Sequence, residues 1–147
     1  MLKARTQGEN WIYRYNGSGS LDDYANSVTW GADSNIYAAG SSYGMLFDFL
    51  VISFSPDGDT NWTYRYSMQD EDDEAFSVIW GADNNIYAAG VTGGCSIMPY
   101  YLQNIYVVSL TPVGNSNWGY WYNGPADDMD AAFSIIYGDD GYIYIAG

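Results

Sequence analysis

The stretch Trp30-Gly-Ala-Asp-Ser-Asn-Ile-Tyr-Ala-Ala-Gly40 decides the fold of this chain, because it occurs three times with few changes. The second copy is Trp80-Gly-Ala-Asp-Asn-Asn-Ile-Tyr-Ala-Ala-Gly90, and the third is Tyr137-Gly-Asp-Asp-Gly-Tyr-Ile-Tyr-Ile-Ala-Gly147. Such close recurrence is typical of one supersecondary unit that is used repeatedly. We therefore expect an array of similar units, in which most of the conspicuous residues build the unit itself.

Two further blocks recur in phase with the first. Residues 10–15 match residues 61–66 and 117–122, and residues 50–58 match residues 106–114. Residues 1–8 align with residues 51–58, so that Gly58 follows Gly8 by 50 positions and Gly114 follows Gly58 by 56. The additional residues lie mostly between Val91 and Asn104, in a segment that holds the single cysteine, Cys95.

Each unit contains four short runs that are typical of β-strands, which we label A to D. In the first unit they are A (residues 25–30), B (35–40), C (49–55) and D (62–66). These runs are rich in Val, Ile, Tyr and Trp, and Gly, Asp, Asn and Pro separate them. Runs B and C are nearly continuously apolar or small, which predicts a sheet covered on both faces. The A–B link has the Asp and Asn of a tight turn, and no helical period is present.

Four antiparallel strands at this period predict a β-propeller blade. The residues resemble the tryptophan-containing β-propeller repeat family of bacterial and archaeal surface proteins. Its motifs match Leu2-Lys3-Ala4 with Gly8 and Trp11, Asp23-Tyr-Ala25-Asn-Ser27-Val28, and Asn35-Ile36-Tyr37-Ala38-Ala39-Gly40. The resemblance implies an extracellular or cell-surface location and a shared scaffold, but no particular activity. The chain departs from the pattern where Ser53 and Ser109 replace the lysine found at Lys3.

The order of the runs is C-D, A-B-C-D, A-B-C-D, A-B. We treat residues 1–147 as a single all-β domain with three blade-equivalents: residues 1–15 plus 132–147, residues 16–66, and residues 67–122. Propellers have about four to eight blades, so three are too few to close a ring. Because open sheet edges are templates for another chain, we expect the two half-blades to complement each other between copies.

We therefore predict a non-enzymatic repeat protein that self-assembles by strand complementation, in a homo-oligomer. A closed homodimer of six blades is the preferred form, and a head-to-tail filament is the second. A fragment of a longer multi-blade surface protein is the third interpretation. Burying one aromatic side chain stabilises by roughly 1.5–3 kcal/mol, so uncovered half-blades should be unstable or adhesive. The expected assembly interface consists of Met1, Leu2, Ala4, Trp11, Tyr13, Tyr15, Ile135, Ile143, Tyr144 and Ile145.

The charge balance limits the partners. The formal charge is −14, with only four basic residues, and nucleic acid binding needs a basic footprint. Nucleic acid is therefore excluded and anionic membrane surfaces are disfavoured, and no apolar run of membrane length is present. Metal cations and neutral partners remain compatible with this charge. The sequons at Asn16 and Asn61 are interpreted as chance matches in a repeat rich in Asn, Ser and Thr.

Acidic residues precede each A run. Asp23, Asp73 and Asp130 occupy one repeat position, which predicts that they accept backbone N–H bonds at a turn. The surplus acids are the candidates for a Ca²⁺ site, because hard cations bind several carboxylate oxygens; these are Asp70, Glu71, Asp72 and Glu74. The Asp57-Gly-Asp59-Thr-Asn61 stretch begins like a calcium loop, but a hairpin turn is the preferred interpretation.

Aromatic residues raise the alternative of a binding module, lectin-like or protein-binding, that uses the B–C loops. The rows of run D, such as Trp62, Tyr64 and Tyr66, favour packing between units, because they recur with period two in every unit. The non-repeated aromatics are the better candidates for contact with a glycan or protein; these are Tyr43, Phe47, Tyr100, Tyr101 and Trp121. We expect Arg14 and Arg65 to cover aromatic faces or to pair with acids.

Catalysis has little support in the sequence. The chain has no histidine, which is the usual general base near neutral pH. Ser residues and Cys95 have no base partner in any motif, and no cofactor motif is present.

Overall fold

The computed structural model describes residues 2–5, 8–17, 19–68, 71–93, 103–126 and 128–147, with side chains from Trp11 onward. This part of the chain contains β-strands and no helix. The strands are β1 (Leu2–Arg5), β2 (Gly8–Ile12), β3 (Asp23–Trp30), β4 (Ile36–Tyr43), β5 (Phe47–Phe54), β6 (Thr60–Tyr66), β7 (Glu74–Trp80), β8 (Ile86–Thr92), β9 (Asn104–Leu110), β10 (Ser116–Tyr122), β11 (Ser134–Tyr137) and β12 (Ile143–Ala146).

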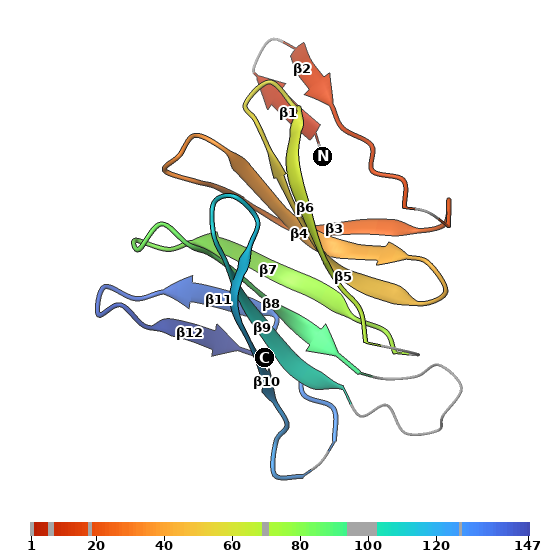
Figure 1. Ribbon diagram of the computed structural model, residues 1–147, viewed down its shortest axis with the longest axis vertical. Coiled ribbons are helices and arrows are strands. Elements are labelled where there is room, and N and C mark those ends of the chain that lie inside the picture. Colours follow the sequence, from red (N-terminus) through yellow and green to blue (C-terminus); the bar gives the residue numbers. More distant parts are fainter. Residues whose placement is uncertain (1, 6–7, 18, 69–70, 94–102, 127) are drawn as a thin grey trace.

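The strands form four antiparallel sheets in chain order. Two are four-stranded, with the orders β3-β4-β5-β6 and β7-β8-β9-β10, and we call them the first and second full sheets. The other two are the N-terminal hairpin β1–β2 and the C-terminal hairpin β11–β12. The sheets are arranged like a fan, with the two hairpins at opposite ends (Figure 1). The expected strand order and the all-β class of four-stranded antiparallel sheets are therefore confirmed.

The pairing registers repeat as closely as the sequence does. In the first full sheet Ser53 lies opposite Trp62, and a register shift follows before Phe54. The N-terminal hairpin has Lys3 opposite Trp11, with the same shift before Ala4. At the other end of the chain, β11 and β12 pair in the register of β3 and β4. Each hairpin therefore reproduces one half of a full sheet.

The core lies between the sheets, because β4, β5, β8 and β9 are buried along most of their length. One cluster joins the two full sheets and contains Tyr37, Phe49, Val78, Ile86 and Tyr106. Two smaller clusters are present. One lies between the N-terminal segment and the first full sheet, and the other lies between the C-terminal hairpin and the second full sheet. This arrangement explains the continuous apolar runs, since side chains on both faces of a central strand meet a neighbouring sheet.

The turns follow the predicted chemistry. In the turn between β3 and β4, the Asn35 amide donates to Asp33 Oδ1 over 3.0 Å, and Ser34 has a φ of 69°. In the turn between β5 and β6, the Ser55 amide donates to the Asp59 carbonyl over 2.8 Å. This segment is therefore a hairpin turn, as the sequence favoured over a calcium loop.

Glycine is required where a tryptophan lies against a turn. Gly114 has a φ of 87°, and a Cβ there would come within 2.7 Å of the Trp62 ring. The Trp62 indole N–H donates to the Pro112 carbonyl of the same turn over 2.8 Å. Trp11 makes the equivalent bond to the Pro56 carbonyl, beside Gly58. These contacts fix each sheet to the β-turn of the next one.

We predict that Gly114→Ala destabilises the protein by about 2–4 kcal/mol, because the left-handed φ and the contact with Trp62 both oppose a Cβ. Gly141→Ala is the matched control. Gly141 has a φ of 82°, but a Cβ there meets only the Tyr137 hydroxyl, at 3.9 Å. It should cost about 1 kcal/mol. Urea denaturation measures both values, and equal values would contradict this account of the Trp62 contact.

Candidate functional site

The junction between the two full sheets shows how units pack. Trp80 on β7 stacks on Tyr37 of β4, with ring centroids 5.6 Å apart and an interplanar angle of 30°. The next junction repeats this contact, since Tyr137 on β11 lies 5.8 Å from Tyr87 of β8. In β7 and β11, the aromatic residue at the end of the A strand therefore packs on the B-strand tyrosine of the preceding unit.

The outer strands contribute a second set of contacts to the junction. The hydroxyls of Tyr64 and Tyr106 lie 3.0 Å apart, and Tyr66 stacks on Tyr106 with centroids at 4.2 Å. Tyr13 packs edge-on against Phe54 at 4.5 Å. The prediction that the first two aromatic rows pack between units is confirmed. The third row differs, because Trp118, Tyr120 and Tyr122 are exposed.

The outward face of the first full sheet is open at β3. Val28 is 60% exposed there, whereas its repeat equivalents Val78 and Ile135 are each 3% exposed. Trp30 is also exposed, although its equivalent Trp80 is stacked on Tyr37. The face has the residues of a junction but no neighbouring sheet over β3.

The open face continues into a hollow of about 320 Å³. It lies between residues 13–15, which follow the N-terminal hairpin, and strands β3, β4 and β5. Its lining includes Tyr24, Ala25, Ala38, Leu50 and Ile52. Ala25 is exposed, while its equivalents Ala75 and Ala132 are fully buried.

The C-terminal hairpin also has an open face, which is the one that would pack on a following unit. Tyr144 is 50% exposed, whereas its equivalents Tyr37 and Tyr87 are 0% and 6% exposed. Ile136, which pairs with Tyr144 across the hairpin, is exposed as well. The other face of this hairpin is covered, because Ile135 and Ile143 pack against the second full sheet.

The structure distributes the predicted assembly residues among these regions. Trp11, Tyr13 and Tyr15 pack on the first full sheet, and Ile135 and Ile143 pack on the second. Tyr144 and Ile145 are exposed. Leu2 and Ala4 pair with β2 through the backbone, and Met1 lies outside the described residues.

Sequence reasoning missed four exposed residues of the open faces: Val28, Trp30, Trp118 and Ile136. The signal that could have found them is their repeat position. Each belongs to the face of a sheet whose neighbouring unit is absent from the linear order of strands.

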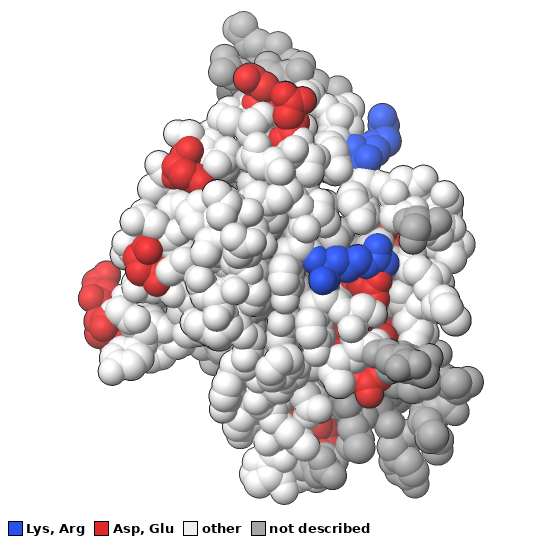
Figure 2. All heavy atoms as spheres, viewed as in Figure 1, with Lys and Arg blue, Asp and Glu red and all other residues white. Residues whose placement is uncertain are grey.

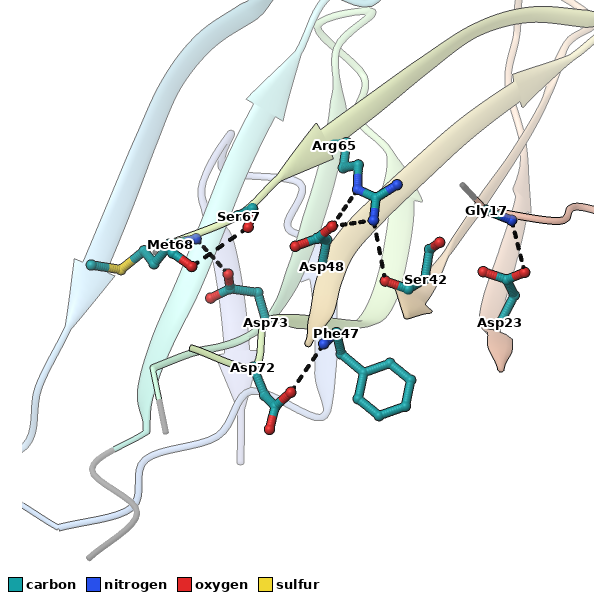
Figure 3. A network of polar contacts seen from close by, with 10 residues as sticks. All are labelled: Gly17, Asp23, Ser42, Phe47, Asp48, Arg65, Ser67, Met68, Asp72 and Asp73. Carbon is teal, nitrogen blue, oxygen red and sulfur yellow. Dashed lines mark hydrogen bonds and ion pairs between the residues drawn. The ribbon is translucent and has the colours of Figure 1, made fainter. Parts of the chain in front are cut away.

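A polar network at one end of the first full sheet connects successive units (Figure 3). Asp23 accepts the Gly17 amide over 3.1 Å, Asp73 accepts the Met68 amide over 2.7 Å, and Asp130 accepts the Gly124 amide over 2.5 Å. Each aspartate thereby fixes the link from a D strand to the following A strand. The predicted turn role of these three residues is confirmed.

Asp73 is the most buried member of this set. It also accepts a hydrogen bond from the Thr92 hydroxyl and a long one, 3.4 Å, from the Gly93 amide. Desolvation raises the pKa of Asp73 above its usual value, and the bonds from Thr92 and Met68 oppose this only in part. The hydrogen bonds therefore hold the carboxylate in place, although burial disfavours its charged form.

Among the surplus acids, Asp72 bonds to the neighbouring unit. Asp72 accepts the Phe47 amide over 3.0 Å, and burial followed by the charge of Asp72 raises the pKa of Glu74. Among the described residues, no group of three or more His, Cys, Asp or Glu is placed to hold a metal ion. Asp70 lies outside these residues, so the calcium prediction stays a prediction.

Arg65 pairs with Asp48 on the neighbouring strand and donates to the Ser42 carbonyl over 3.5 Å (Figure 3). This confirms the prediction that Arg65 forms an ion pair with a nearby acidic residue. The pair is partly exposed, so its contribution to stability is small.

The candidate ligand-binding aromatics contact other aromatic rings. Tyr43 and Phe47 meet edge-on at 4.8 Å, and Phe47 also lies 5.6 Å from Tyr24. Trp121 donates its indole N–H to the Tyr66 hydroxyl over 3.1 Å and remains half exposed. The structure thus brings Tyr43 and Phe47 together and places Trp121 at the junction of the full sheets. Tyr100, Tyr101 and Cys95 lie outside the described residues.

The tyrosines of the B strands are bound to turn aspartates. Tyr87 donates to Asp83 over 2.6 Å, and desolvation together with this bond raises the pKa of Tyr87 to about 12. In the C-terminal hairpin, the hydrogen bond from Tyr144 lowers the pKa of Asp140. The side chain of Asn61, the asparagine of the second sequon, is also hydrogen-bonded. Its side-chain nitrogen donates to Asn35 Oδ1 and to Ser53 Oγ over 3.1 Å each. A glycan at Asn61 would disturb these bonds.

No protein-family model matches this chain, and no curated protein sequence matches it either. A search of the described residues for a helix with the length and hydropathy of a membrane span found none.

We predict that the free energy of unfolding of the wild type, minus that of Asp73→Asn, decreases as the pH rises above 3.8, the ordinary pKa of Asp. The folded protein holds the Asp73 proton more tightly than the unfolded chain, so this contribution is lost as the pH passes the raised pKa. Urea denaturation of both proteins across this range measures the difference. A difference that grows with pH would show that the hydrogen bonds outweigh desolvation.

Proposed function

We propose that this chain is a non-enzymatic β-propeller repeat protein that assembles with copies of itself by strand complementation. The C-terminal hairpin of one copy supplies the inner half of a four-stranded sheet, and the N-terminal hairpin of another supplies the outer half. The proposed sheet has the order β11-β12-β1-β2, with the last two strands from the second copy. The resemblance to repeats of surface proteins suggests an extracellular or cell-surface setting.

The observation that supports this proposal most is the match of registers. In the first full sheet β4 pairs with β5, with Tyr37 opposite Ser53 and Ala38 opposite Ile52. By repeat equivalence, the free edge of β12 would pair with β1 of a second copy, with Ile145 opposite Leu2. The two hairpins have the pairing of complementary halves, including the register shift in β1. An edge with this register is a template for its own missing half.

The exposed apolar side chains support the same proposal. Trp118, Tyr120 and Tyr144 are each 42–58% exposed in one chain, and covering such a side chain stabilises by roughly 1.5–3 kcal/mol. Trp118 is the equivalent of Trp62, which packs against a turn of the next sheet. By repeat equivalence, the segment between β1 and β2 of a second copy matches this turn, and Gly8, the first residue of β2, has the repeat position of Gly58 and Gly114.

The contact joins different surfaces of the two copies, so it is heterologous. It gives a closed ring if the rotation per copy suits closure, and a filament otherwise. Two copies would make six units, which lies within the usual range for propellers. We therefore propose the closed dimer as the preferred form.

The net charge of −14 opposes association at low ionic strength. Acidic side chains lie along the edge of the fan that carries the A–B turns, and the described basic side chains on this face lie apart from one another (Figure 2). At 0.1 M salt, the repulsion between exposed charges that lie more than about 10 Å apart is largely screened. The proposal therefore implies tighter assembly as salt is added.

We predict that Leu2→Cys with Ile145→Cys, in a Cys95→Ser background, forms disulfides between copies under mild oxidation. Residues directly opposite in a sheet have the separation that a disulfide needs. Non-reducing electrophoresis separates the products, and light scattering gives the mass of the unmodified chain. A discrete dimer indicates a ring, and a ladder of sizes indicates a filament.

The matched control replaces Leu2→Cys by Ile12→Cys. Ile12 lies opposite Leu2 on β2, one strand further from β12 in the proposed sheet. This pair should therefore cross-link much more slowly. A monomeric mass for the wild type, together with equal cross-linking of the two pairs, would overturn the proposed assembly; that result would be expected if neighbouring units of one longer polypeptide cover these faces.

A further inference from the structure

Edge pairing uses only the backbone edges of the hairpins, but the open face on β3 belongs to a different surface. This face comprises Ala25, Val28 and Trp30, together with the hollow beside them. At the junction inside the chain, the equivalent residues Ala75, Val78 and Trp80 are covered by the first full sheet. The open face therefore carries the chemistry of a junction whose other half is missing.

The other half must present a tyrosine opposite Trp30. Inside the chain this partner is Tyr37, which stacks on Trp80, or Tyr87, which packs on Tyr137. Tyr144 stands at the same repeat position and is held by a 2.5 Å bond to Asp140, as Tyr37 is by Asp33. It is also the B-strand tyrosine that is half exposed rather than buried.

The hollow has the position that the C-terminal hairpin would need. It is bounded on one side by residues 13–15, which continue from the N-terminal hairpin, and on its floor by β3, β4 and β5. If β12 of a second copy pairs with β1, the hairpin β11–β12 lies on the β3 side of β1, over this floor. At the internal junction the equivalent space is filled by β3 and β4 of the preceding sheet, which contact β7.

We infer that the open face of β3 and its hollow form a socket for the C-terminal hairpin of a second copy, with Tyr144 of that copy stacked on Trp30. This inference rests on the proposed self-assembly and adds a sheet-to-sheet contact to the edge pairing. The same hairpin is then fixed twice, by its β12 edge to β1 and by its face to β3. The step between copies thus repeats the step between units within a chain, which favours a continuous propeller over two chains joined loosely at an edge.

The internal junction also indicates which contacts confer specificity. The Ser27 hydroxyl accepts the Val78 amide over 3.2 Å, and the Asn26 side chain donates to the Ala75 carbonyl over 2.9 Å. Ser134 stands at the repeat position of Ser27 in the C-terminal hairpin, and it is exposed. In the socket, Ser134 of the second copy is placed to accept the amide of Val28.

The test introduces a charge into the socket. Val28→Asp puts a carboxylate at a site that is exposed in one chain but covered in the proposed assembly, as Val78 is covered by the apolar cluster of the internal junction. Burying an unpaired charge is costly, so the dissociation constant should rise on the order of 100-fold, as measured by sedimentation or light scattering over a dilution series. Because Val28 is exposed in one chain, the variant should keep the wild-type circular dichroism, and its unfolding midpoint should equal that of the wild type at concentrations where both proteins are monomeric.

The matched control is Val113→Asp. Val113 is an exposed valine in the turn between β9 and β10, and Asp57 occupies the equivalent position in the first full sheet. This variant should assemble like the wild type. Equal dissociation constants for Val28→Asp and Val113→Asp would overturn the socket while leaving edge pairing intact. A wild-type chain that stays monomeric would instead overturn the proposed function itself.

A mixing experiment tests whether the partner is a second copy in the head-to-tail arrangement. Ile136→Asp disables the hairpin face and leaves the socket intact, whereas Val28→Asp does the reverse. Each variant alone has two defective junctions in a closed dimer, but a heterodimer of the two has one intact junction. An equimolar mixture should therefore assemble more tightly than either variant alone. A mixture that assembles no better would overturn the assignment of the hairpin to the socket.

Discussion

The structure depends on the packing of one sheet face against the next. The central strands β4, β5, β8 and β9 carry apolar or small side chains on both faces, so each full sheet is stable only with a neighbour on each side. The aromatic contacts Trp80–Tyr37 and Tyr137–Tyr87 mark this packing at the ends of the A strands. An isolated unit would expose two apolar faces, and for this reason the units form an array.

Two polar devices determine how the array is joined. The repeated aspartates accept backbone amides where a D strand leads into the next A strand. The indole N–H groups of Trp11 and Trp62 donate to carbonyls of turns in the following sheet. The aspartate bonds lie where a D strand ends and the tryptophan bonds lie near where a D strand begins, so the sheets are joined at both ends of these strands.

The same physical requirement that joins the units leads to the proposed function. The open faces of the first full sheet and of the C-terminal hairpin have residues that are buried at every internal junction. In the proposed assembly, a second copy offers the matching residues at the matching repeat positions, and these would cover the exposed tryptophans and tyrosines. Acidic charge on the turns would keep the uncovered chain in solution by repulsion between copies.

The sequence by itself determined the repeating elements. Period, strand order, turn chemistry and the role of Asp23, Asp73 and Asp130 all follow from local patterns, because hydrogen bonds in turns and alternation in strands involve residues close in the chain. The tertiary structure decided which copy of a repeated residue is covered. Val28 and Val78 have nearly identical neighbours in sequence, but only Val78 has a sheet above it. Exposure depends on the neighbouring unit rather than on the residue. The repeat position could therefore point to the open faces, but their measured exposure, the hollow beside β3 and the Trp121–Tyr66 contact required the tertiary structure.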